Sequence, residues 1–113
     1  MTDRFAGVST HVLDTGRGAP APDVPVRIER RDAEGWTRLA DGRTDNDGRL
    51  RDWVPAGDWR AGDYRLLFLV EAHLGDPAFF PEITVAFRVQ DPDRHHHVPL
   101  LLNRYGYTTY RGS

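Results

Sequence analysis

The sequence contains no cysteine and no lysine, and all 15 basic residues among its 113 are arginine. Without cysteine the chain can form neither a disulfide framework nor a thiolate zinc site, and it has no cysteine nucleophile. A G-x-S-x-G motif is also missing, so we expect no serine nucleophile at Ser9 or Ser113. The net charge of −2 gives no electrostatic reason to expect nucleic acid as a partner. Because no disulfide is possible, we expect stability to come from packing.

Long apolar runs and helical periodicity are missing as well. The longest apolar runs, residues 66–70 and 98–102, are far shorter than the roughly 20 residues that a membrane span requires. The N-terminus lacks the apolar core of a secretory signal, so we expect a cytoplasmic protein with no membrane partner. The only helix that the pattern suggests is a short turn at Glu71–Leu74.

Alternation of apolar and polar residues with a period of two dominates instead. Val24, Val26 and Ile28 alternate with polar residues, and the same pattern runs through residues 83–89, which is typical of half-buried strands. Glycine- and proline-containing turns separate further expected strands at residues 8–14, 36–43, 64–70, 95–102 and 105–110. Seven short strands predict an all-β antiparallel sandwich, and the length predicts one domain over residues 1–113.

Two of the expected strands carry histidines on the face opposite their core residues. If Val12 and Leu100 point into the core, the alternation turns His11 and His97 away from it. Two leucines share this outward face, Leu13 and Leu101. Because an apolar patch outside the core usually marks a partner surface, we expect a subunit interface beside the two histidines.

The histidines are the residues best suited to chemistry near neutral pH. The ordinary pKa of histidine, about 6.5, lets His11 and His97 serve as general base and general acid. An alternative is that both bind a zinc ion together with His95, although no H-E-x-x-H motif is present. His96 is turned toward the core, and His73 is expected in a loop with only a surface or packing role.

Two segments resemble the signatures of the transthyretin family. The first comprises THVLD at residues 10–14, GAPA at 18–21 and VPV at 24–26, and the second comprises HVPLLL at 97–102 and YGYTTYRGS at 105–113. The resemblance covers residues 7–113. The closing YRGS and the histidines at positions 11 and 97 resemble the 5-hydroxyisourate hydrolases of this family rather than its thyroid-hormone carriers.

This resemblance implies a prealbumin-like sandwich of two four-stranded sheets, assembled as a homotetramer with active sites between dimers. It implies hydrolysis of the cyclic amide of 5-hydroxyisourate to 2-oxo-4-hydroxy-4-carboxy-5-ureidoimidazoline in urate degradation, without a metal or other cofactor. The matched catalytic residues are His11, Arg49 and His97, and the substrate-binding residues are His11, Arg49, Tyr110 and Ser113. In this scheme Arg49 stabilises the oxyanion and one histidine takes a proton from water; which of the two does so stays open.

The chain departs from the family pattern at a few positions. His96 replaces a common tyrosine, and Asn103 and Thr108 stand where serine is usual; none of these changes removes a matched site residue. The segment 70–80 is shorter than the corresponding connection of the family. The sequence therefore does not decide whether the short helix of that connection is present. The alternative function is a noncatalytic carrier of small ligands, since a sandwich fold alone does not determine function.

Overall fold

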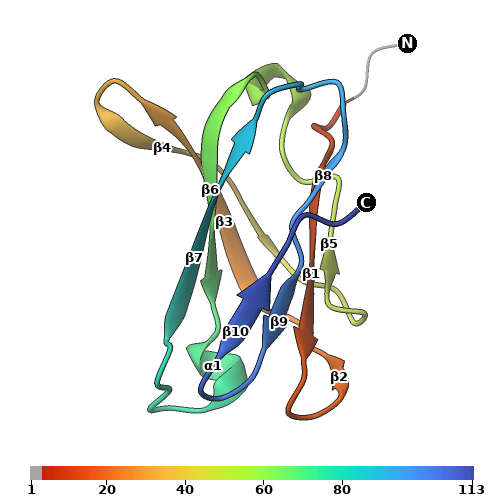
Figure 1. Cartoon of the computed structure of the whole chain (residues 1–113), viewed down its shortest axis with the longest axis vertical. Coiled ribbons are helices and arrows are strands. Elements are labelled where there is room, and N and C mark those ends of the chain that lie inside the picture. The colour runs from red at the N-terminus through yellow and green to blue at the C-terminus, as the bar shows by residue number, and fades with distance from the viewer. Residues whose placement is uncertain (1–3) are drawn as a thin grey trace.

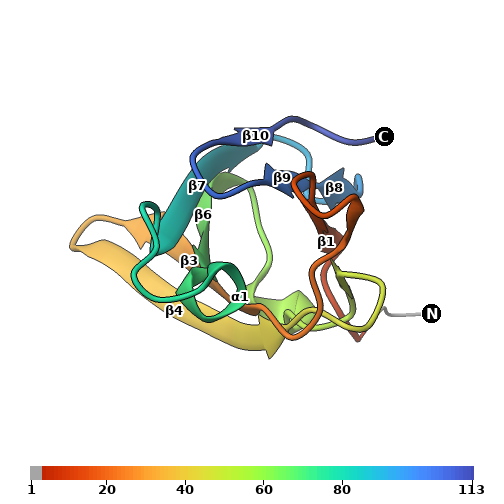
Figure 2. The same cartoon turned by 90° about the horizontal axis from the view of Figure 1, so that it is seen from below.

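The computed structural model describes residues 4–113, which form two β-sheets packed face to face (Figures 1 and 2). The first sheet has the strand order β4-β3-β6-β7, and all of its neighbouring strands are antiparallel. Its strands are β3 (Pro25–Asp32), β4 (Gly35–Arg43), β6 (Gly62–Leu69) and β7 (Glu82–Val89).

The second sheet is built around β1 (Val8–Asp14) and has the order β10-β9-β1-β2, with β5 and β8 also paired to β1. The remaining strands are β2 (Ala19–Pro20), β5 (Arg49–Leu50), β8 (His96–His97), β9 (Leu100–Leu102) and β10 (Tyr107–Thr109). The predicted sandwich is confirmed, but this sheet has six short strands and is mixed, because β8 and β9 run parallel to β1. The expected strand over residues 95–102 is interrupted at Val98 and Pro99, where proline cannot donate a ladder hydrogen bond.

The core lies between the two sheets and contains the inward side chains of both. Val12 and Leu100 are fully buried, and His96 is 5% exposed, so the predicted alternation is confirmed in β1, β8 and β9. The largest fully buried side chains of the first sheet are Ile28, Tyr64, Leu66, Phe68 and Ile83. Because Val12 points into the core and side chains alternate along β1, Ser9 and His11 lie on the face of β1 that points away from the core.

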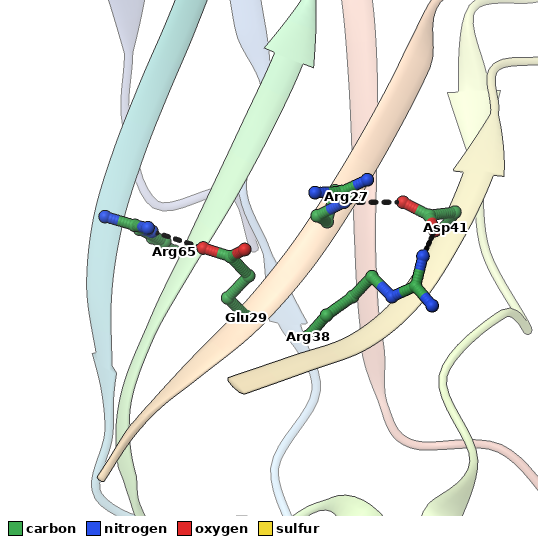
Figure 3. Close-up of polar contacts among 5 residues, drawn as sticks. All are labelled: Arg27, Glu29, Arg38, Asp41 and Arg65. Atoms are coloured by element: carbon green, nitrogen blue, oxygen red, sulfur yellow. Dashed lines mark hydrogen bonds and ion pairs between the residues drawn. The ribbon is translucent and has the colours of Figure 1, made fainter. Parts of the chain in front are cut away.

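The outer face of the first sheet carries charged pairs, two of which link neighbouring strands (Figure 3). Arg65 on β6 binds Glu29 on β3 at 2.6 Å. Asp41 on β4 accepts from Arg27 at 2.9 Å and from Arg38 at 3.0 Å. The two pairs of Asp41 are exposed, and each contributes about 1 kcal/mol or less. The Arg65–Glu29 pair is largely shielded from water, because Glu29 is buried.

Two short helices complete the fold: η1 (Ala56–Asp58), before β6, and α1 (Glu71–Leu74), between β6 and β7. The turn suggested at Glu71–Leu74 is therefore confirmed, and the shorter connection keeps a helix. The expectation that His73 lies in a loop is wrong, because His73 is part of α1 and its Nε2 lies 2.7 Å from Asp14 Oδ2 in a buried pair. Burial alone would raise the pKa of Asp14, but the hydrogen bonds with His73 and the Arg17 amide lower it. Within residues 4–113 no helix is long and apolar enough to span a membrane.

Candidate active site

The outward face of β1 brings together chemistry-bearing residues from three distant segments. In the antiparallel pairing with β5, His11 lies opposite Arg49. In the parallel pairing with β8, Ser9 lies opposite His97. A central strand that pairs with β5 on one side and β8 on the other therefore places the predicted His11, Arg49 and His97 on one surface, with Ser9 between them.

The turn before β5 fixes the backbone of Arg49. The Asp45 carboxylate accepts hydrogen bonds from the amides of Asp47 (2.8 Å) and Arg49 (3.0 Å). These bonds lower the pKa of Asp45, and the bond from Arg49 has the largest effect. Gly48 has a φ of 76°, and a Cβ at this position would collide with the carbonyl oxygen of Val12. The turn can therefore lie against β1 only because it contains glycine there.

His11 is held by the same turn. Its Nε2 lies 2.7 Å from the carbonyl oxygen of Asp47. A carbonyl only accepts hydrogen bonds, so Nε2 must carry a proton and donate it, and Nδ1 is the nitrogen of neutral His11 that has a free lone pair.

His97 is held from two sides. Its Nδ1 lies 2.8 Å from Ser9 Oγ, and its backbone carbonyl accepts from the amide of Gly112 at 2.9 Å. The pKa of His97 is lowered by burial first and then by the nearby positive charges of Arg49, His95 and His11. A lowered pKa keeps the ring neutral near pH 7, which is the state that a general base requires.

Arg49 and His97 border a pocket of about 260 Å³. It is lined by Ser9, Thr10, Arg49, Leu50, Arg51, His95, His97 and Ser113. A larger hollow of about 650 Å³ lies on the outer face of the first sheet, but no histidine lines it and its Arg27 and Asp41 bind each other. The smaller pocket is therefore the better candidate for catalysis.

The structure thus gathers most of the predicted site. Arg49, His97 and Ser113 line the pocket, and His11 is the cross-strand neighbour of Arg49. Tyr110 is not among the lining residues; it borders a separate hollow of about 300 Å³ on the side of β7, which His97 also lines. Sequence reasoning did not assign Ser9 to the site, although its position two residues before His11 places both on one face of β1.

The zinc alternative finds no support in the arrangement of the side chains. Within residues 4–113 no three His, Cys, Asp or Glu side chains are placed to hold a metal ion. His95 Nε2 and His97 Nδ1 both point at Ser9 Oγ, at 2.7 and 2.8 Å, and His11 Nε2 points at a carbonyl. The three rings therefore use one nitrogen each in hydrogen bonds within the protein.

The chain is similar to known proteins over nearly its whole length. A protein of Caulobacter vibrioides named 5-hydroxyisourate hydrolase is 45% identical over 116 residues, covering 96% of this chain and 100% of the relative. One of Salmonella typhimurium with the same name is 45% identical over 109 residues, covering 94% of this chain and 80% of the relative. The solved structure of sea bream transthyretin in complex with thyroxine is 30% identical with a TM-score of 0.86, covering 94% of each chain. With a family match over residues 8–112, the chain belongs to the HIUase/Transthyretin family.

Proposed function

We propose that this chain is a 5-hydroxyisourate hydrolase, which opens the ring of its substrate at the cyclic amide. The observation that carries the proposal is the 45% identity, over nearly the whole chain, to relatives that bear this name. The pocket supports it, because a neutral histidine and an arginine side by side suit amide hydrolysis better than the binding of an apolar ligand.

The proposed reaction begins with His97 as the general base. Its Nδ1 is bound to Ser9, so Nε2 is the ring nitrogen left to take a proton from the attacking water. The resulting hydroxide adds to the amide carbonyl carbon, and the Arg49 guanidinium stabilises the negative charge that develops on the carbonyl oxygen. The lowered pKa of His97 and its place in the pocket support this choice over His11.

The second half of the reaction breaks the carbon–nitrogen bond. The ring nitrogen leaves with a proton and the carbonyl carbon becomes a carboxylate, so one further proton is released to solvent. We assign the donation to His11, whose Nδ1 can carry the proton while Nε2 stays bound to Asp47. We assign substrate binding and orientation to Ser113, which lines the pocket, and to Tyr110, which borders the neighbouring hollow that His97 also lines. No step in this scheme requires a metal ion.

We further propose that the functional unit is a homotetramer with its sites between dimers. Leu13 and Leu101 support this, because both are only half-buried on the face that carries the histidines. A second subunit placed over that face would cover the leucines and exclude water from the open pocket.

The test of the function uses the arginine. The decay of the transient absorbance of freshly made 5-hydroxyisourate is measured with wild type, with Arg49→Ala and with Arg38→Ala as control. Removal of one oxyanion donor commonly lowers turnover by about 10²–10³, so Arg49→Ala should be slow. Arg38 lies on the outer face of β4 with Asp41, and its variant should match wild type. Equal rates for Arg49→Ala and wild type would refute the assignment.

A further inference from the structure

The proposed base belongs to a hydrogen-bonded chain of three polar side chains. Ser9 Oγ stands between two imidazole rings, 2.8 Å from His97 Nδ1 and 2.7 Å from His95 Nε2. The parallel register that sets Ser9 opposite His97 produces this arrangement, since His95 lies two residues earlier and on the same face. Ser9 is only 9% exposed, whereas His95 is open to solvent. All three side chains line the same pocket, and the chain runs along the pocket wall to the exposed ring of His95.

The hydroxyl of Ser9 links the protonation of the two rings. It carries a single proton, so it can donate to one imidazole nitrogen and must accept from the other. If His97 Nδ1 donates to Ser9, then Ser9 donates to His95 Nε2, and the free lone pair of His97 is on Nε2. If the direction is reversed, His97 carries its proton on Nε2 and cannot act as a base. The tautomer of His97 thus depends on whether His95 Nε2 accepts a hydrogen bond from Ser9 or donates one to it.

We propose that Ser9 and His95 are positioning residues that select the basic tautomer of His97 and carry its proton away, a role that rests on the proposed hydrolase function. In the step, His97 Nε2 takes one proton from water, His97 Nδ1 passes one to Ser9 Oγ, and Ser9 passes its own to His95 Nε2. One proton moves in total, His97 and Ser9 end neutral, and His95 becomes an imidazolium. His95 then returns the proton to solvent, and no electrons are transferred.

The charges around the pocket favour moving the proton off His97. Arg49 on β5 and His11 on β1 both disfavour a positive charge on this ring. Besides these residues, Ser9 and His95, the charged or polar residues of the pocket wall are Thr10, Arg51 and Ser113. His95 is exposed, so water can solvate the charge there. His95 also borders a second pocket, whose charged lining residues are Arg4, Arg51 and Asp52.

The kinetic test compares Ser9→Ala, His95→Gln and the double variant with wild type. The carbonyl oxygen of a glutamine can still accept from the Ser9 hydroxyl but does not take up a proton, so His95→Gln separates proton transfer from selection of the His97 tautomer. We expect kcat to fall about tenfold or more in each single variant, part of the 10²–10⁴ that general base catalysis provides. The double variant should be no slower than Ser9→Ala, because both changes interrupt one path. The control is Thr84→Ala, which removes an exposed hydroxyl from β7.

Wild-type kcat in His95→Gln, or losses that multiply in the double variant, would overturn the relay. An ester on Ser9, detected by mass spectrometry after rapid quenching, would also overturn it, because Ser9 would then be a nucleophile.

A second measurement does not depend on turnover. The titration of the two rings is followed by nitrogen NMR in wild type and in Ser9→Ala. The relay predicts that the titrations of His95 and His97 are coupled more strongly in wild type than in the variant, where only the charge interaction between the two rings remains. Identical titrations in both proteins would refute the link. A wild type that shows the coupling but no hydrolysis would refute the proposed function and leave the hydrogen-bonded chain established.

Discussion

Replacement of Gly112 by alanine should displace the His97 ring while leaving the sandwich folded. A Cβ built on Gly112 would lie 3.4 Å from His97 Cβ, 3.2 Å from Cγ and closer still to Cδ2. Carbon atoms in contact are normally about 3.5–4.0 Å apart, so the ring or the Gly112 backbone must move by roughly 1 Å. A misplacement of about 1 Å can cost about 10² in rate. We therefore expect kcat/KM to fall about 100-fold, or about 2.7 kcal/mol of transition-state stabilisation.

The assay is the decay of 5-hydroxyisourate absorbance, with thermal unfolding measured on the same samples. Gly106→Ala is the matched control, since a Cβ there would lie 3.6 Å from Asn103 Oδ1, an ordinary contact. The control should keep wild-type activity. If Gly112→Ala also kept it, the close packing of this segment on His97 would have no part in catalysis and the reasoning would be refuted.

Three further predictions concern pH, stability and assembly. Because the pKa of His97 is lowered, the acid limb of kcat/KM should lie below the value of about 6.5 expected for an ordinary histidine; a limb above it, in a pH–rate profile, would contradict the assignment of the base. His73→Ala leaves the buried Asp14 without its side-chain partner and should lower the free energy of unfolding in urea by about 1–3 kcal/mol, whereas unchanged stability would mean that the pair contributes nothing. Leu101→Arg should dissociate the proposed tetramer in light scattering, and an unchanged mass would exclude this face as an interface.

The sequence predicted the sandwich because its period-2 pattern reflects burial directly. The alternation around Val12 and Leu100 determined which side of each strand meets the core, and it correctly turned His96 inward. The pairing of the strands cannot be predicted in the same way, because alternation carries no information on which strands are neighbours or in which direction they run. The parallel pairing of β1 with β8 therefore could not be predicted, and with it the contact between Ser9 and His97.

The aromatic residues of the last predicted strand show another limit of the sequence pattern. Aromatic side chains at alternate positions of a strand are typical of core packing, yet Tyr105 and Tyr107 are 72% and 43% exposed. Tyr107 contacts Phe80 edge-on at a centroid distance of 5.3 Å, outside the core. A period-2 pattern of aromatics indicates a strand but does not say whether another layer covers that strand, and β10 is the edge of its sheet.

The central claim is that this pocket hydrolyses 5-hydroxyisourate without a metal ion. It is tested most directly by following the absorbance decay of freshly generated 5-hydroxyisourate with and without wild-type protein, each in the presence and absence of a strong chelator. We predict a decay that the protein accelerates equally in both conditions. Acceleration that the chelator abolishes would contradict the metal-free mechanism, and no acceleration at all would contradict the hydrolase and favour a carrier of small ligands.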